Sequence, residues 1–222
     1  MRYLVSYLLE PISHLVYFAA LFYWAGKDKR GIIKILSGYY FLAGLLGLKS
    51  ALLIAQTNIQ TYSLLCVLTS FGLGAYFYNV LQLRWQKIFV LFLCLINGAY
   101  YLFQNVIEDG LPVFDSLAYA ILSSTIVMMI FMYMHQLLNS VKEEPLSMSF
   151  DFWFVSSQFV YFLGAFAIFL TYGYLTTKVL SNATFTNTAV TWLWGLHNVL
   201  LFLSALVTSG GIAWISSHKK SP

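Results

Sequence analysis

Hydrophobic residues form seven long stretches along this chain, separated by short polar segments. An α-helix needs roughly 20 apolar residues to cross the hydrocarbon core of a bilayer, and each stretch is close to that length. The pattern predicts an all-α polytopic membrane protein, a bundle of seven transmembrane helices. The expected spans are Tyr3–Trp24, Ile32–Ala55, Tyr62–Leu83, Ile88–Ile107, Leu117–Asn139, Phe152–Thr177 and Ala189–Ser216.

The composition excludes most soluble classes of protein. Hydrophobic residues make up 60% of the 222 positions and charged residues only 9%, whereas a soluble domain carries about 25% charged residues. No linker or low-complexity segment divides the chain. We therefore expect residues 1–222 to form a single transmembrane domain, with no separate catalytic or nucleic-acid-binding domain.

The distribution of positive charge predicts the orientation of the bundle. Loops on the cytoplasmic side of a membrane are enriched in Lys and Arg. With the N-terminus outside and the C-terminus in the cytoplasm, only Arg2 and Lys178 lie in outer segments. The inner segments then hold Lys27, Lys29, Arg30, Lys34, Arg84, Lys87, Lys142, Lys219 and Lys220. We expect the plasma (inner) membrane as the location. Because the positive charge marks one membrane face, it is not a nucleic-acid signal.

The first stretch carries polar side chains on one helical face. Five of them recur at spacings of three and four residues, namely Tyr3, Tyr7, Glu10, His14 and Tyr17. Ionisable groups are costly inside a bilayer, so they usually face the bundle interior and mark a functional site. Two interpretations stay open. Glu10 and His14 satisfy each other in a helix contact, or this face forms a wall that binds a ligand or handles protons.

Lys49 is the only basic residue well inside a predicted stretch, about two helical turns from its outer end. Its long side chain can extend to the outer surface and keep the ammonium group in water. The alternative is an ion pair with Glu10, which sits at a similar depth and would neutralise the charge inside the membrane. The sequence leaves both arrangements open.

The fourth and seventh stretches also carry polar faces. In the fourth, four side chains fall at i, i+4, i+7 and i+11, namely Asn97, Tyr101, Gln104 and Glu108. In the seventh, Trp194 and His197 begin a polar stripe in the outer half. Asn and Gln in membrane helices also serve as hydrogen-bonding groups between helices. Asn97, considered by itself, could therefore have only a packing role.

The depths of these polar side chains converge on the outer half of the membrane. We therefore expect one ligand-binding cavity, open to the outside, lined by Glu10, His14, Lys49, Asn97, Tyr101, Gln104, Trp194 and His197. Polar residues of the inner half, such as Ser157 and Gln158, are interpreted as boundary residues that reach water or lipid headgroups.

The sequence motifs that several known functions require are absent from this chain. The seventh stretch has no lysine that could hold retinal, and no P-loop, Cys-x-x-Cys or Pro-Gln motif occurs. We expect no cofactor and no metal. A zinc site on Glu10, His14 and His197 remains an alternative, because three ligands with an open position are the usual catalytic zinc geometry.

These observations favour a receptor- or sensor-like binding module without enzymatic activity of its own. In layout the chain resembles the compact seven-helix sensory modules that accompany bacterial signalling kinases, an analogy of organisation only. A small molecule would enter from the outer side, and the basic inner loops would contact anionic lipid or a signalling or membrane-protein partner. A small proton-coupled transporter or channel subunit is the first alternative. A metal-dependent lipid hydrolase is the second, and a purely structural subunit remains open too.

Overall fold

The computed structural model describes residues 8–52, 59–103, 114–140, 145–179 and 183–218. These residues form seven α-helices, one short 3₁₀-helix and no strand. The elements are α1 (Leu9–Ala25), α2 (Gly31–Leu52), α3 (Ile59–Val80), α4 (Arg84–Leu102), α5 (Ser116–Leu138), η3 (Leu146–Met148), α6 (Phe150–Val179) and α7 (Ala183–His218). The predicted all-α class and the seven helices are confirmed.

Length and composition identify the fold as a helical membrane bundle. Six helices, α2 to α7, are long and apolar enough to cross a bilayer. The described part of α1 has 17 residues, and the predicted start of that span, Tyr3, lies outside the described residues. The prediction of a multi-pass membrane protein is therefore confirmed, while its orientation stays a prediction.

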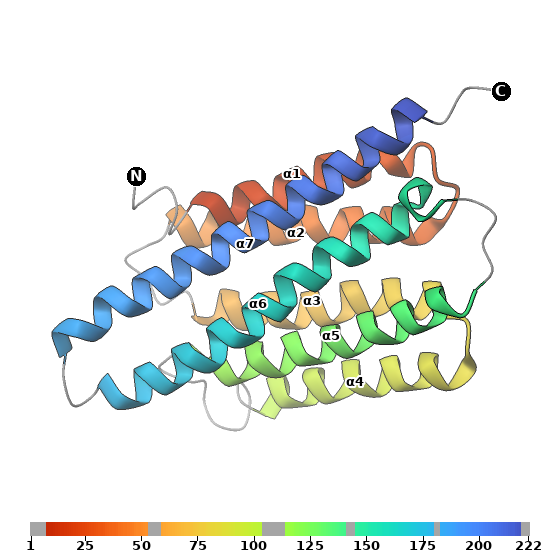
Figure 1. Cartoon of the computed structure of the whole chain (residues 1–222). Helices are drawn as coiled ribbons and strands as arrows, with labels where there is room; N and C mark the ends of the chain where they lie inside the picture. The colour runs from red at the N-terminus through yellow and green to blue at the C-terminus, as the bar shows by residue number, and fades with distance from the viewer. Residues whose placement is uncertain (1–7, 53–58, 104–113, 141–144, 180–182, 219–222) are drawn as a thin grey trace.

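The seven helices pack in chain order into a closed bundle (Figure 1). Each helix contacts the next one along the chain, and α7 returns to pack against α1. Helix α3 also contacts α5 directly, behind α4. As a result α4 has only α3 and α5 as helical neighbours and lies on the outside of the bundle.

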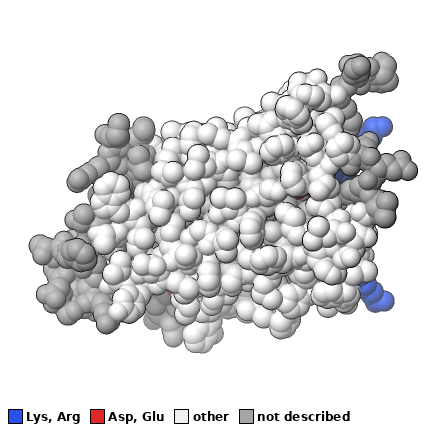
Figure 2. Space-filling model, viewed as in Figure 1, with Lys and Arg blue, Asp and Glu red and all other residues white. Residues whose placement is uncertain are grey.

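On the visible face of the molecule, charged side chains gather at one end (Figure 2). The described Lys and Arg side chains appear there, and the sides of that face are free of charge. Large apolar side chains cover the outward face of α4, including Trp85, Leu91, Phe92 and Leu95, each at least half exposed. In a bilayer these side chains face lipid, which explains why an exposed apolar surface is tolerated here.

Two glycines of α2 let α1 approach closely and so position the polar face of α1. A Cβ atom added at Gly44 would lie 3.2 Å from the Leu15 side chain, and one at Gly47 would lie 3.4 Å from Pro11. Small residues at such contacts allow two membrane helices to pack backbone to backbone. The contact turns Glu10 and His14 into the bundle.

Two helices extend beyond their predicted ends. Helix α6 runs to Val179 and α7 begins at Ala183, whereas the predicted spans stop at Thr177 and start at Ala189. The extra turns carry polar Thr and Asn residues, so hydropathy excludes them from the span although the backbone remains helical. Cys66 and Cys94 are both buried and free.

Candidate ligand-binding cavity

A small cavity of about 30 Å³ lies inside the bundle. Helices α1, α2, α3, α5, α6 and α7 all contribute to its wall, through Glu10, His14, Tyr39, Tyr40, Leu65, Thr69, Tyr119, Gln158, Tyr161, Phe162, His197 and Leu201. A water molecule needs about 10–15 Å³ of such space. The cavity therefore has room for about two molecules of that size.

Glu10 is the acidic group of the cavity, and its side chain is only 6% exposed. Among the described residues, the Tyr62 hydroxyl donates to its carboxylate at 3.4 Å, which is long for an O–H···O contact. Among the described residues both ion pairs are made by Arg30, and neither involves Glu10. Since a buried carboxylate without a cation is expensive, Glu10 requires a proton or a bound cation.

His14 follows Glu10 by one helical turn and lines the same cavity. Its ring lies 5.8 Å from the ring of Tyr40, centroid to centroid. Its Nδ1 atom is buried and has no hydrogen-bond partner among the described residues. An unpaired buried ring nitrogen is a costly arrangement, and a ligand that donates a hydrogen bond to it would remove the cost.

His197 comes from α7, which packs against α1, and both of its ring nitrogens have hydrogen-bond partners. Its Nε2 lies 2.7 Å from the Tyr161 hydroxyl and its Nδ1 lies 3.0 Å from Oδ1 of Asn198. An amide oxygen only accepts, so this pattern fits a neutral imidazole that donates from Nδ1 and accepts at Nε2. The ring of Trp194 packs against His197 at 5.5 Å, one layer outside the cavity.

The structure brings together only part of the predicted site. Glu10, His14 and His197 line one cavity. Lys49 is exposed on α2 and makes no ion pair with Glu10. Of the two arrangements open for Lys49, the structure has the one in which its side chain points out of the bundle.

The predicted residues of the fourth span lie elsewhere. The described part of α4 contributes no residue to the cavity wall, because α3 and α5 touch each other between α4 and the cavity. Asn97 is buried, but its amide donates to the Leu93 carbonyl of its own helix. Tyr101 is half-buried on α4, and Gln104 and Glu108 lie outside the described residues.

Several cavity residues were missed because they are aromatic or were placed at the wrong depth. Tyr39, Tyr40 and Tyr161 lie in Tyr-rich segments, where tyrosine is hard to separate from the interfacial belt. The interpretation of Ser157 and Gln158 as boundary residues is wrong, since both are 1% exposed. The described α6 begins at Phe150, so both residues lie two helical turns inside it.

A cluster of hydroxyl and amide groups continues from the cavity toward the basic end. Gln158 lines the cavity and donates to the Tyr17 hydroxyl at 2.7 Å. That hydroxyl donates to Oγ of Ser204 at 2.9 Å and lies 3.3 Å from Oγ of Ser157. Ser157 and Thr208 are joined at 2.7 Å. The cluster links α1, α6 and α7 in the middle of the bundle.

Stacked aromatic rings extend this connection further. Tyr17 stacks on Tyr40 at 4.2 Å and meets the edge of Phe154 at 6.3 Å. Phe154 stacks on Phe150 at 5.7 Å, and Phe150 stacks on Trp24 at 5.8 Å. Rings in direct contact therefore run from the cavity wall to the end of α1 where the basic residues gather.

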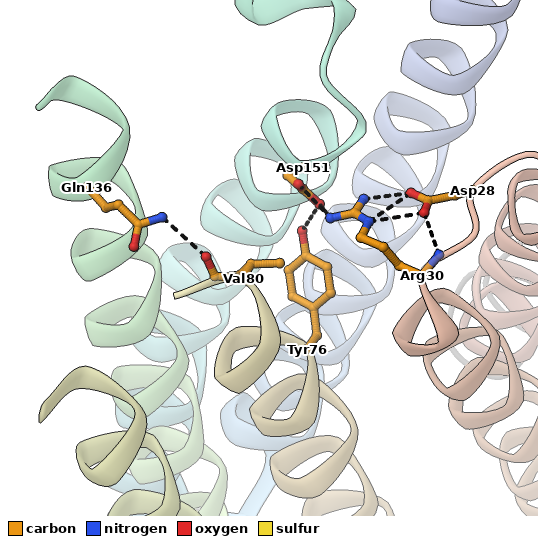
Figure 3. A network of polar contacts seen from close by, with 6 residues as sticks. All are labelled: Asp28, Arg30, Tyr76, Val80, Gln136 and Asp151. Carbon is orange, nitrogen blue, oxygen red and sulfur yellow. Dashed lines mark hydrogen bonds and ion pairs between the residues drawn. The ribbon is translucent and has the colours of Figure 1, made fainter. Parts of the chain in front are cut away.

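A polar network closes the basic end of the bundle (Figure 3). The Arg30 guanidinium pairs with Asp151 at 2.8 Å and with Asp28 at 2.7 Å. The Tyr76 hydroxyl donates to Asp151 at 2.8 Å. The network ties the loop after α1 to α3 and α6, and Gln136 of α5 donates to the Val80 carbonyl at the end of α3.

Arg30 also sets the charge state of its loop partner. Partial burial favours the neutral form of Asp28, but hydrogen bonds from Arg30 and its positive charge outweigh that effect and lower the pKa of Asp28. Burial lowers the pKa of Arg30, but the hydrogen bonds and negative charges of Asp28 and Asp151 outweigh that effect and raise it. The loop pair is therefore fully ionised at neutral pH.

The described residues contain no group of three or more His, Cys, Asp and Glu side chains placed to hold a metal ion. Glu10, His14 and His197 share a cavity but do not converge as a ligand set. No family model matches this chain, and neither a curated protein nor a solved structure matches it.

Proposed function

We propose that this protein is a receptor- or sensor-like binding module of the plasma (inner) membrane, in which the Glu10 cavity takes up a small polar ligand from the outer side. It has no enzymatic activity of its own in this proposal. The observation that carries it is a buried carboxylate that forms no ion pair with any described residue, in a water-sized cavity lined by hydrogen-bonding side chains. Such a site is incomplete on its own and is completed by what binds there.

The contacts beyond the cavity support a sensor rather than a passive binding site. Gln158 belongs both to the cavity wall and to the Tyr17 cluster. Aromatic contacts then lead from Tyr17 through Phe154 to Trp24 and Tyr76. A ligand that repositions Gln158 or Tyr40 would change packing along this route, and the inner network at Arg30 would be its last member. Anionic lipid or a signalling partner at the basic end would receive the change.

One observation favours the proton-coupled transporter or channel subunit as a second candidate. The hydroxyl cluster of Tyr17, Ser157 and Thr208 prolongs the cavity toward the basic end, and such chains can carry protons. Phe154 and Phe150 then lie between this cluster and Trp24. Proton flux into liposomes, measured with an internal pH dye, would distinguish this candidate from a sensor that conducts nothing.

A thermal-stability panel tests the proposed binding function. Purified protein would be heated with small cations, zwitterions, anions and neutral amides, because a ligand that binds only the folded state raises the melting temperature. We expect at least one solute to stabilise the wild type and to lose its effect in Glu10→Gln. Lys49→Gln is the control, since it changes an exposed charge on the neighbouring helix. The proposal is wrong if no solute acts, or if the effect survives Glu10→Gln.

A further inference from the structure

We propose that the ligand of the Glu10 cavity is a small ammonium-type cation, ammonium itself or methylammonium. This inference rests on the proposed function and names the chemical class of its ligand. It is carried by the charge, the size and the donor–acceptor character of the cavity wall.

The charge of the wall selects a cation. Among the described lining residues Glu10 is the only acidic one, and none of them is Lys or Arg. The two imidazoles, His14 and His197, carry no formal charge when neutral, and the hydrogen bonds of His197 fit that form. An ionised Glu10 therefore leaves the cavity with one uncompensated negative charge. A monovalent cation balances it, whereas an anion would add a second buried charge.

The size of the cavity sets a narrow limit on that cation. About 30 Å³ accommodates two bodies the size of water. Ammonium with one water molecule matches this volume, and so does methylammonium alone. Tetramethylammonium carries four methyl groups and exceeds it, so the site should reject the larger ion although the charge is the same.

The wall is built of hydrogen-bond acceptors, which favours ammonium over an alkali metal ion of similar size. Ammonium donates four hydrogen bonds. The wall offers the Glu10 carboxylate, the hydroxyls of Tyr39 and Thr69, and the ring of His14, whose Nδ1 has no partner among the described residues. An imidazole nitrogen accepts a hydrogen bond well, but hard cations prefer oxygen ligands. His14 therefore discriminates in favour of a cation that carries protons.

Aromatic rings supply the rest of the wall. Four tyrosines and Phe162 line the cavity together with the two imidazoles. Ring faces attract cations, and aromatic cages are a recurrent way to hold ammonium groups in proteins. A carboxylate at one side of a ring-lined, water-sized space is the arrangement that this class of ligand requires.

Titration calorimetry of the purified, detergent-solubilised full chain tests this inference with four salts: ammonium, methylammonium, potassium and tetramethylammonium chloride. We expect saturable heats for the first two and none for the last two. Glu10→Gln should weaken ammonium binding about 30-fold or more, since truncating one partner of a buried charge pair removes most of its contribution. Glu10→Asp keeps the charge and should retain measurable binding.

Tyr133→Phe serves as the matched control. It removes a hydroxyl from a buried tyrosine of α5 that does not line the cavity, so ammonium affinity should stay at the wild-type value. A cooperative thermal transition would establish that each variant is folded before titration.

Two outcomes would overturn the inference. Equal affinities for potassium and ammonium would mean that the site recognises only the positive charge of the ion. If neither ammonium nor methylammonium gives a heat of binding, Glu10 is neutralised by a proton and not by a cation. If ammonium fails while another solute of the stability panel acts through Glu10, the binding function stands and only the ligand class is wrong. If no solute acts through Glu10, both proposals fail.

Discussion

Glu10 and Lys49 lie on two helices that touch, yet their charged groups stay apart. Glu10 is buried on α1, whereas Lys49 is exposed on α2. A lysine side chain can lie along apolar surface and place its ammonium group in the headgroup region. That solution removes the desolvation cost of Lys49 without neutralising Glu10, so the carboxylate remains available to a ligand.

The separation of these two residues predicts additive effects. Glu10→Gln and Lys49→Met should change the free energy of unfolding independently, with an interaction term of no more than about 0.5 kcal/mol. Thermal or denaturant unfolding of both single variants and the double variant in detergent would measure it. A rescue of Glu10→Gln by Lys49→Met would show that the two charges do meet in the membrane.

For the helices, the spacing of polar residues predicts which face of each helix is polar, but it does not predict which helices pack side by side. The face of α1 that carries Glu10, His14 and Tyr17 does point into the bundle, because buried polar groups need polar partners. The polar face of the fourth span was recognised equally well. Helix α4 nevertheless lies outside the cavity, because α3 and α5 contact each other between α4 and the cavity. The spacing of residues within α4 carries no information about this contact between α3 and α5.

The packing of α6 against α7 offers a sharp test with two adjacent glycines. A Cβ atom at Gly211 would overlap the Trp153 side chain, which is held by a hydrogen bond from Nε1 to the Ser147 carbonyl. Gly210 has open space at the same position. Gly211→Ala should therefore lower the free energy of unfolding by about 1–3 kcal/mol, and Gly210→Ala should not lower it. Melting temperatures of the two variants would decide, and equal effects would contradict the described packing.

The loop between α1 and α2 should respond to acid. The contacts with Arg30 lower the pKa of Asp28 below its ordinary value of 3.8, despite partial burial. A depressed carboxyl pKa contributes stability that is present above the ordinary value and is lost as pH falls through the lower, folded-state value. The wild type should thus melt higher than Asp28→Asn at about pH 7, and the difference should shrink as the pH falls below the ordinary value of 3.8. A difference that grows on acidification would mean that Arg30 does not stabilise ionised Asp28.

For the whole molecule, the sequence is sufficient to predict the class of fold, but it is not sufficient to identify the residues of the cavity. Hydropathy fixes helices in a membrane because every backbone polar group must be paired inside its own segment. The cavity depends on which helices adjoin and on tyrosines from α2, α5 and α6. Tyr40 and Tyr161 look like many other tyrosines in this chain, so only their positions in three dimensions identify them.

Orientation is a property of the whole chain and remains to be measured. Nine of the 12 Lys and Arg residues lie in the predicted inner segments, so a reporter fused after Pro222 should be cytoplasmic and a tag before Met1 should be accessible from outside. Paired alkaline phosphatase and fluorescent-protein fusions would show it. Both ends on the same side would contradict seven spans, and the reversed order would turn the Glu10 cavity toward the cytoplasm.

We propose that the Glu10 cavity binds a ligand and that the basic end of the bundle responds. Trp194 packs on His197 beside the cavity, and Trp24 stacks on Phe150 at the other end. The most direct measurement is the nitrogen–proton spectrum of the six tryptophan indoles in lipid nanodiscs, titrated with the solute that most stabilises the wild type. Trp194→Phe and Trp24→Phe would assign the two signals. Both signals should shift along one saturation curve in the wild type, and neither should shift in Glu10→Gln. A shift of Trp194 alone would contradict the sensor, and a shift of neither would contradict the site.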